Sequence, residues 1–168
     1  MKSIFKLFVA AFLTVAPLTA TAQSNVAHIN VQQLISEMPE VIAAQNELAK
    51  LEKDYTTQID NAFKEFQTKA QSYSSDAANQ TDVTNQARQK ELESMQTNLQ
   101  EFRDSAAQEL QKKQMDLMTP LLEKARNAIT KVGEEQGFNY VIDSSPNGGV
   151  ILANGKDLLE DVKKELGF

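Results

Sequence analysis

The segment "YTTQIDNAFKEFQTKAQSY", residues 55–73, decides the fold of this chain because it places large apolar groups in a polar, helix-forming sequence. Its apolar residues continue a series in which successive members are three or four positions apart. That spacing forms one stripe along an α-helix, close to an 11-residue repeat, which favours a nearly straight or slightly right-handed pair. The stripe consists of Leu48, Leu51, Tyr55, Ile59, Ala62, Phe66, Ala70 and Tyr73. Such a helix needs a partner that covers the stripe.

The partner follows a polar stretch, "SSDAANQTDVTNQ", residues 74–86, whose residues favour turns and helix N-caps. The chain from 41 to 119 contains neither Gly nor Pro, which favours long helices. The pattern therefore predicts an antiparallel helical hairpin over 41–119 with its tip near 74–86. Each helix of about 38 residues would reach about 57 Å at 1.5 Å per residue. Beyond the turn the stripe resumes as Leu92, Met95, Leu99, Phe102, Ala106 and Leu110.

A turn centred near residue 80 sets the register of this hairpin. It places Phe66 opposite Met95 and Ile59 opposite Phe102, and it places Tyr55 opposite Ala106. The predicted seam consists of Leu51, Ile59, Phe66, Leu92, Leu99, Phe102 and Leu110. Phe63 lies beside the stripe, and the polar ends of Tyr55 and Tyr73 tolerate partial exposure. These three aromatic residues, with the adaptable Met95, are candidates for an apolar surface that contacts another molecule.

The first 22 residues are typical of a secretory signal peptide. Lys2 and Lys6 precede and open an apolar run, and the small residues "ATA" at 20–22 form a cleavage site. The apolar run is too short to span a bilayer comfortably. We therefore expect export, with cleavage after Ala22 and a mature chain that starts at Gln23.

The two ends of the mature chain, residues 23–40 and 120–168, are expected to form a small body. Alternation predicts a strand over Val26–Val31, followed by a short helix that ends before Pro39. After the hairpin, Thr119 and Pro120 indicate either a new helix start or a kink. Gly137 suits the C-terminal cap of the helix before it.

The last third of the chain adds two predicted strands and a helix. The segment "FNYVID", residues 138–143, and the segment "VILA", residues 150–153, flank the turn signal "SSPNGG" at 144–149. We expect the second segment to return as a strand. "DLLEDVKKEL", residues 157–166, is predicted to be a helix with Asp157 as its N-cap.

A body of this size has a poor surface-to-volume ratio, and three short strands leave free sheet edges. Self-association through strands that pack or pair between subunits is therefore predicted. The candidate contact residues are Ile29, Val31, Phe138, Tyr140, Ile142, Val150 and Leu152. Pro39 and Pro120, where the hairpin meets the body, are predicted hinges.

Composition narrows the function. The 168 residues suffice for one domain, and the absence of Cys excludes a disulfide framework and a Cys-linked lipid anchor. The formal net charge is −6, and it becomes −8 when Lys2 and Lys6 are removed with the signal peptide. Such an acidic chain is not expected to bind nucleic acid or anionic lipid through bulk charge.

Catalytic patterns are missing from the sequence. His28 is the sole His, and a packed or solvent-facing place in the body is far more common for such a residue than a role as catalytic base. The sequence has no cluster of metal ligands, no nucleophile with a partner base and no Gly-rich phosphate loop. We therefore expect no enzyme activity, no cofactor and no metal.

The order of these segments resembles the Skp/OmpH family of periplasmic chaperones for outer-membrane proteins. The similarity is carried by "AHINVQQLISEMPE" (27–40), "QKKQMDLMTPLLEKARNAITKVGEEQGFNYVIDSS" (111–145) and the closing "DLLEDVKKEL" (157–166). It covers essentially the whole mature chain. The order of the pieces is more specific than any single piece, because coiled-coil sequences imitate one another.

The resemblance implies a jellyfish-like homotrimer, mainly α-helical, with a small β-containing trimerisation body and three coiled-coil arms around a cavity. It implies a periplasmic, ATP-independent holdase that keeps unfolded outer-membrane β-barrel proteins from aggregating before membrane insertion. Tyr55, Phe63, Tyr73 and Met95 then become candidates for contact with these clients. Many weak contacts from three arms would hold a client without fixing its conformation.

One feature departs from the pattern of the family, whose best-known members are strongly basic toward the arm tips. Between Lys64 and Glu93 this chain has five acidic and four basic residues. That balance argues against membrane or lipopolysaccharide contact by the tips. An alternative function from another class is a structural coiled-coil spacer or adaptor of the cell envelope without chaperone activity. An adaptor would bind one folded protein, whereas a chaperone would hold many unfolded chains.

Overall fold

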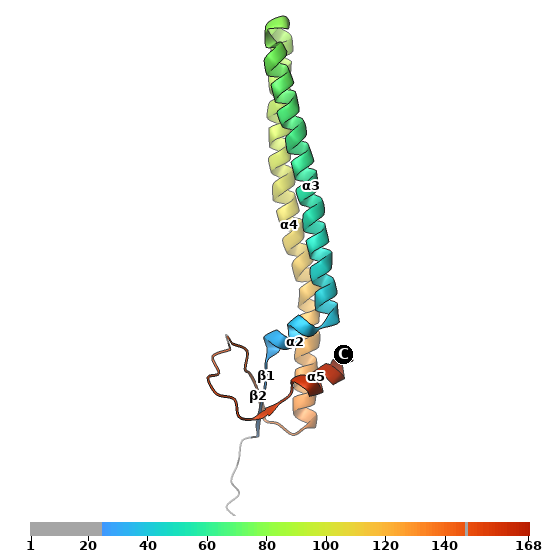
Figure 1. The fold of residues 1–168 in the computed structure, drawn as a ribbon, viewed down its shortest axis with the longest axis vertical. Coiled ribbons are helices and arrows are strands. Elements are labelled where there is room, and N and C mark those ends of the chain that lie inside the picture. Colours follow the sequence, from blue (N-terminus) through green and yellow to red (C-terminus); the bar gives the residue numbers. More distant parts are fainter. Residues whose placement is uncertain (1–24, 147) are drawn as a thin grey trace, which may run out of the picture.

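The computed structural model describes residues 25–146 and 148–168, and it shows a long helical arm attached to a small α/β body (Figure 1). In chain order the elements are β1 (Val26–Ile29), α2 (Val31–Glu37), α3 (Pro39–Asp76), the 3-10 turn η1 (Ala77–Asn79), α4 (Asp82–Glu135), β2 (Tyr140–Asp143), β3 (Lys156–Asp157) and α5 (Leu159–Leu166). The predicted mainly helical fold with a long hairpin and a small sheet is confirmed. The signal peptide predicted over 1–22 lies outside the described residues.

The arm consists of α3 and α4, which run side by side from the body to a tight connection at the far end (Figure 1). Pro39 opens α3, where a missing backbone N–H costs nothing. Thr81 caps α4, because its hydroxyl accepts a hydrogen bond from the Thr84 backbone N–H at 3.2 Å. The connection occupies only 77–81 and is therefore shorter than the predicted 74–86, because α3 continues through the polar residues up to Asp76.

Pro120 lies inside α4, which runs without interruption from the arm tip into the body. The prediction of a new helix starting at Thr119 and Pro120 is therefore wrong. Proline removes one backbone hydrogen bond from a helix interior, but the residues on either side pack well enough to keep the helix continuous. Leu121 and Ala125, in the next turns, pack in or against the core of the body.

The sheet of the body has three strands in the order β2-β1-β3, and both pairings are parallel. Val26 to Ile29 pair with Tyr140 to Asp143, while Ala27 and His28 pair with Lys156 and Asp157. The first strand is shorter than predicted: Asn30 caps α2, its side chain accepting from the Gln33 N–H at 2.9 Å, and Val31 is already helical. The N-cap of α5 is Leu158, one position after the predicted Asp157, and the Asp157 side chain accepts a hydrogen bond from the Leu159 N–H at 2.9 Å.

The predicted returning strand "VILA" is wrong, since residues 150–153 form no strand and the third strand is Lys156–Asp157. Ile151 is fully exposed and Leu152 is 75% exposed. The buried face of β1 is already covered by the side chains of α2, α4 and α5, so the chain offers these residues no apolar partner of its own. The segment instead forms a loop that projects sideways from the body (Figure 1).

One hydrophobic core holds the body together. Ala27 and Ile29 of β1 pack with Leu34 of α2, Val132 of α4 and Val162 of α5. Gly133 allows the end of α4 to lie against β2, because a Cβ there would come within 2.8 Å of the Val141 side chain. Gly137 has φ +73°, which fits its predicted role just after the end of α4.

We expect Leu34→Ala to lower the free energy of unfolding by about 2–5 kcal/mol, because it opens a cavity in the only core of the described residues. Urea denaturation followed by circular dichroism would measure the loss. Val83→Ala, at an exposed position near the arm tip, is the matched control and should change the midpoint little. Equal effects of the two substitutions would contradict the placement of the core.

Candidate functional site

The long sides of the arm are the first candidate surface, because a pair of helices can bury only a narrow seam. Leu99 and Ala106 are buried, while the other predicted seam residues are half-buried. The Tyr55 and Phe102 rings pack edge to face with centroids 6.0 Å apart. Lys113 pairs with Glu47 at 2.8 Å, about two turns beyond the predicted Tyr55–Ala106 pair and within one residue of the same register. The structure therefore has a register within about one turn of the predicted one.

An apolar groove runs along the arm beside this seam. The rings of Phe63 and Phe66 stack at 6.5 Å, and Phe63 is 41% exposed. The groove has a volume of about 530 Å³, and its other lining residues are Leu99, Thr97, the amides Gln96 and Gln100, and the charged Glu93 and Arg103. It offers aromatic surface together with amide groups that can both donate and accept hydrogen bonds.

Tyr55 and Met95 are less available than Phe63, since both are half-buried. The Tyr55 hydroxyl bonds to the Glu109 carboxylate, and this bond raises the pKa of Tyr55. Tyr55 therefore helps to join α3 to α4. Phe63 is the member of the four candidate contact residues that is most open to solvent.

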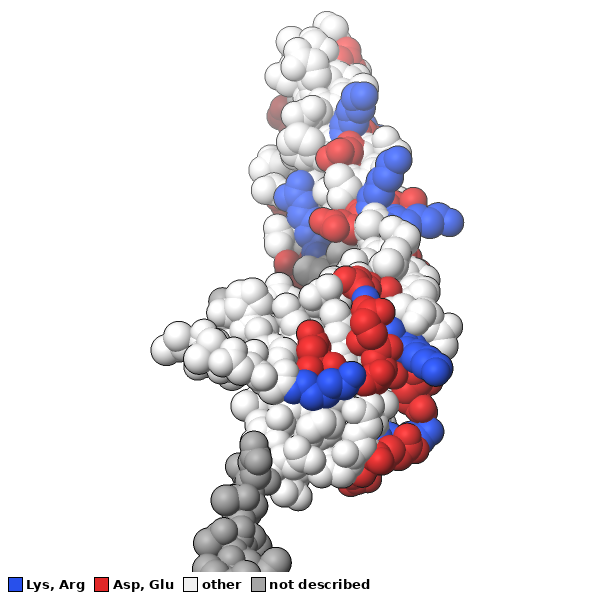
Figure 2. Space-filling view, turned by 60° about the horizontal axis from the view of Figure 1, so that its bottom comes forward, with Lys and Arg blue, Asp and Glu red and all other residues white. Residues whose placement is uncertain are grey.

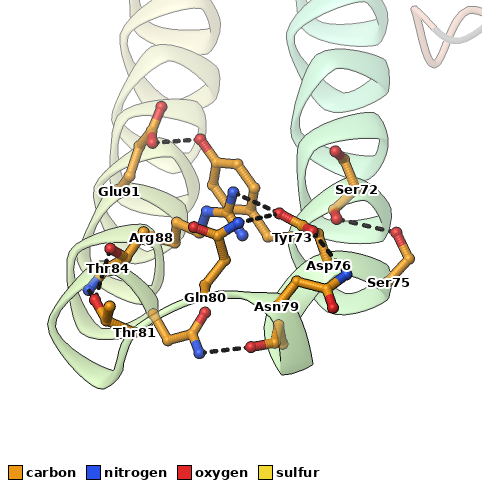
Figure 3. Close-up of polar contacts among 12 residues, drawn as sticks. Ser72, Tyr73, Ser75, Asp76, Asn79, Gln80, Thr81, Thr84, Arg88 and Glu91 are labelled. Atoms are coloured by element: carbon orange, nitrogen blue, oxygen red, sulfur yellow. Dashed lines mark hydrogen bonds and ion pairs between the residues drawn. The ribbon is translucent and has the colours of Figure 1, made fainter.

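Tyr73 belongs to a polar cluster that closes the arm tip (Figure 3). Its hydroxyl donates to Glu91 at 2.6 Å, and Lys69 forms an ion pair with the same carboxylate. The Arg88 guanidinium lies over the Tyr73 ring at 4.7 Å and also donates to Asp76 at 3.0 Å. These contacts join α3 to α4 across the connection. We name Lys69, Tyr73, Asp76, Arg88 and Glu91 the tip cluster.

Each charged group of the tip cluster has an ion-pair partner within the chain, although Arg88 Nη1 is buried without a hydrogen-bond partner among the described residues. The Lys69 ammonium, and then the Tyr73 hydroxyl, lower the pKa of Glu91. Arg88, and then Asn79, lower the pKa of Asp76, which also accepts from Gln80 at 2.7 Å. The two basic groups of the cluster are therefore committed to internal carboxylates. Sequence reasoning proposed Tyr73 for client contact and missed this role, because the partners Glu91 and Arg88 lie on the opposite helix.

The body carries the second candidate surface. Tyr140 and Ile142 of β2 are exposed, whereas Val141 between them packs against the core. Ile29 is buried, and Val31 and Phe138 are half-buried against the same core. Within one chain the predicted contact residues of the body therefore divide into core residues and exposed residues, and only the exposed ones can face another molecule.

Ile151 is a surface residue that the sequence prediction missed. The candidate contact residues included Val150 and Leu152 but not Ile151, which is the most exposed large apolar residue of this loop. The signal was present as an apolar run inside a stretch without charges, residues 144–155. Figure 2 shows the projection at the left of the body free of charged groups.

Charged groups cover the other surfaces of both parts. Figure 2 shows basic and acidic side chains interspersed along the arm, and acidic groups gathered on the side of the body away from the projecting loop. Many of them are paired, for example Lys124 with Glu40 at 2.7 Å and Lys131 with Glu165 at 2.6 Å. Exposed pairs of this kind connect α4 to α3 and to α5, but they contribute little to stability.

Residues 25–146 and 148–168 hold no group of three or more acidic or His side chains placed to bind a metal ion. None of their helices has the length and apolar character needed to cross a bilayer. His28 lies in β1, where its Nε2 donates to the Gly155 carbonyl at 3.1 Å and its Nδ1 lies 3.2 Å from the Ser144 hydroxyl. These contacts give His28 a structural role at the base of the projecting loop.

We expect the tip cluster to make the stability of the arm depend on pH, with a loss of stability in acid. Because the pKa values of Asp76 and Glu91 are lowered by folding, their contribution is present above about pH 4 and is lost as the pH falls through the folded-state values. Asp76→Asn should therefore lower the thermal midpoint at pH 6 and have little effect at pH 2.5. Circular dichroism melts at both pH values would measure this difference.

Asp60→Asn is the matched control, because Asp60 is an exposed carboxylate on α3 that forms no ion pair among the described residues. It should leave the midpoint almost unchanged at both pH values. A loss at pH 2.5 as large as at pH 6 would show that Asp76 does not act through its charge.

Comparison with known proteins agrees with this architecture. A family model described as outer membrane protein (OmpH-like) matches residues 25–166. The "Chaperone protein Skp" of Yersinia enterocolitica is 24% identical over 159 residues, which span 92% of this chain and 93% of that protein. The family match thus spans every described element, from β1 to the end of α5. Since it extends over far more than half of the sequence, this chain belongs to the OmpH-like family.

Proposed function

We propose that this protein is a periplasmic, ATP-independent holdase that binds unfolded outer-membrane β-barrel proteins and prevents their aggregation before membrane insertion. Membership of the OmpH-like family and the similarity to a protein named a chaperone support this function. Export with removal of residues 1–22 is part of the proposal. The observation that carries it is the exposed aromatic groove of Phe63 and Phe66 on a long arm outside the folded core.

The proposed working form is a homotrimer whose arms, residues 41–119, surround a cavity. The exposed Tyr140, Ile142 and Leu152 of the body support association, since apolar groups of this size are usually covered in a stable protein. Beyond the seam, the sides of each arm are not packed against other parts of the chain. These sides can therefore contact other molecules. Three arms would multiply several weak contacts into useful avidity.

Client contact is assigned first to Phe63, with Tyr55, Tyr73 and Met95 contributing only the parts of their side chains that remain open. An aromatic side chain among flexible polar neighbours can contact many apolar sequences without selecting one backbone conformation. The tip cluster would act as a closure that keeps the two helices of each arm together. Its paired charges leave the tip without a surplus of basic groups, and this argues against binding to anionic lipid.

The decisive experiment is light scattering on residues 23–168, alone and after dilution of a urea-unfolded β-barrel membrane protein into the sample. The proposal expects a trimer alone and a soluble complex of trimer and client. A trimer that leaves the client to precipitate would favour a spacer or adaptor. A monomer would overturn the proposed assembly.

We expect Phe63→Ser to weaken client binding by roughly three- to tenfold without changing the oligomeric mass, because one aromatic contact of about 1 kcal/mol is lost from the groove. Fluorescence anisotropy of a labelled, unfolded β-barrel protein would measure the affinity. Val83→Ser removes another exposed apolar group near the tip and should bind the client like the wild type. An unchanged affinity of Phe63→Ser would remove the groove from the proposal.

Pro39 and Pro120 are proposed hinges between arm and body. Pro39 follows the break between α2 and α3, and Pro120 removes a hydrogen bond from α4 near the same level, about one turn before the Lys124–Glu40 ion pair. We expect Pro120→Ala to stiffen the arm and narrow the range of client sizes that remain soluble. Native mass spectrometry of complexes with small and large β-barrel clients would measure that range, and an unchanged range would count against the hinge.

A further inference from the structure

The apolar groove on the side of the arm carries opposite charges at its two ends. Its middle consists of the stacked rings of Phe63 and Phe66, whose centroids are 6.5 Å apart, and of the buried Leu99. Among its lining residues only Glu93 and Arg103 are charged, and both are exposed. We call Glu93 the acidic end and Arg103 the basic end of the groove.

The contacts between α3 and α4 place the two rings between these ends. On α4, Glu91 pairs with Lys69 on the tip side of the rings, and Phe102 packs against Tyr55 on their body side. The two phenylalanines come between Tyr55 and Lys69 in α3, so they face the part of α4 between Phe102 and Glu91. The acidic end is two positions from Glu91, and the basic end is one position from Phe102. A molecule in the groove therefore meets an acidic group, then aromatic surface, then a basic group.

Neither end is neutralised within the described part of the chain. Glu93 accepts a hydrogen bond from the uncharged Gln89 amide at 3.1 Å and takes part in no ion pair among residues 25–146 and 148–168. In the same residues, Arg103 forms neither an ion pair nor a side-chain hydrogen bond. The tip cluster differs, because Lys69 and Arg88 are both paired there with carboxylates. Two opposite charges beside the rings thus remain available to a bound molecule.

The length of the groove matches a short extended segment. Glu93 and Arg103 are ten positions apart on α4, about 15 Å at 1.5 Å per residue. An extended chain rises about 3.3 Å per residue, and its alternate side chains point to the same side. Residues i and i+4 of such a segment are therefore about 13 Å apart, with the side chain of residue i+2 between them. Flexible charged side chains cover the remaining distance.

We propose that this groove prefers an extended segment of an unfolded client in which an aromatic or aliphatic side chain stands between a basic and an acidic one, at positions i, i+2 and i+4. The basic side chain pairs with Glu93, the apolar side chain lies on the two rings, and the acidic side chain pairs with Arg103. The two charges can stand in either order, because a chain in the groove can run in either direction. This inference rests on the proposed holdase function and names the kind of client segment that the arm prefers.

Charge complementarity makes the favoured occupant a segment of this kind rather than a purely apolar one. A purely apolar segment would remove water from Glu93 and Arg103 without giving them partners, which costs free energy. Exposed ion pairs each contribute little, so the preference is graded and many sequences still bind. β-barrel membrane proteins gather aromatic residues at the two membrane interfaces, where their strands meet polar turns and loops. Segments that combine aromatic and charged residues are therefore expected in the proposed clients.

The test compares two labelled peptides of identical composition by fluorescence anisotropy with residues 23–168. The patterned peptide contains copies of Lys-Ser-Phe-Ser-Asp, and the control peptide contains copies of Lys-Asp-Phe-Ser-Ser, joined in both by the same Gly/Ser linkers. Because net charge and apolar content are equal, only the spacing of the charges differs. The wild type should bind the patterned peptide roughly three- to tenfold more tightly. That preference should fade at high salt, which screens exposed charges.

Protein variants then assign the preference to the two ends of the groove. Arg103→Glu should abolish the preference, because both ends are then acidic. Adding Glu93→Arg to that variant should restore it, because the two charges are exchanged and the segment binds in the reverse direction. Lys53→Glu makes the same charge change at an exposed position of α3 outside the groove and should keep the preference. Circular dichroism checks that the arm of each variant stays helical.

Another copy of the arm is the alternative occupant of the groove. The photo-crosslinking residue p-benzoylphenylalanine at position 97, which lines the groove, distinguishes the two occupants. With the patterned peptide present, it should cross-link to the peptide. Cross-links between two arms that persist in excess peptide would overturn the inference.

The outcomes separate this inference from the proposed function. Loss of the preference in Arg103→Glu and its return with Glu93→Arg would support the inference. Equal binding of the two peptides by the wild type, or no return of the preference after the exchange of charges, would overturn it, while light scattering with the unfolded β-barrel protein still decides the holdase function. A clear preference together with precipitation of that protein would support the groove as a peptide site and defeat the holdase function.

Discussion

The arm depends on the burial of one narrow apolar stripe between two helices. Leu99 and Ala106 are buried in this stripe. The flanking aromatic residues stay partly exposed, because a helix pair covers its apolar residues only where the two helices face each other. The contact that holds α3 to α4 therefore also leaves Phe63 at the surface. The exposed aromatic surface and the structural seam are neighbouring parts of the same stripe, and they differ only in which residues the opposite helix covers.

The body has the complementary constraint. Its single core is filled by side chains from both ends of the chain, with β1 in the middle of the sheet and α4 entering from the arm. Once that core is complete, the apolar loop 150–152 and the exposed residues of β2 have nothing left to cover them within one chain. The small body thus leaves apolar surface uncovered within one chain, and this supports the proposed self-association.

Electrostatics organises the arm without driving its association. The tip cluster pairs two basic and two acidic groups internally, and the Lys113–Glu47 ion pair joins the two helices near the base of the arm. The proposed holdase function requires the two helices of the arm to stay together, and polar contacts between them meet this requirement without adding apolar surface. The net negative charge of the chain also argues against binding to anionic partners, which depends on surplus positive charge.

Local patterns in the sequence determined the helices, the hairpin and its approximate register, since the spacing from Leu48 to Leu110 has one simple geometric solution. They also located Pro39, β1 and the cap at Gly137. Only the tertiary structure decided the parallel sheet, the uninterrupted passage of α4 through Pro120 and the partners of Tyr73. These features depend on contacts between opposite helices or between segments more than a hundred residues apart, such as β1 and β2. A short apolar run such as 150–153 forms a strand only when another strand is available to pair with it, and here it remains a loop.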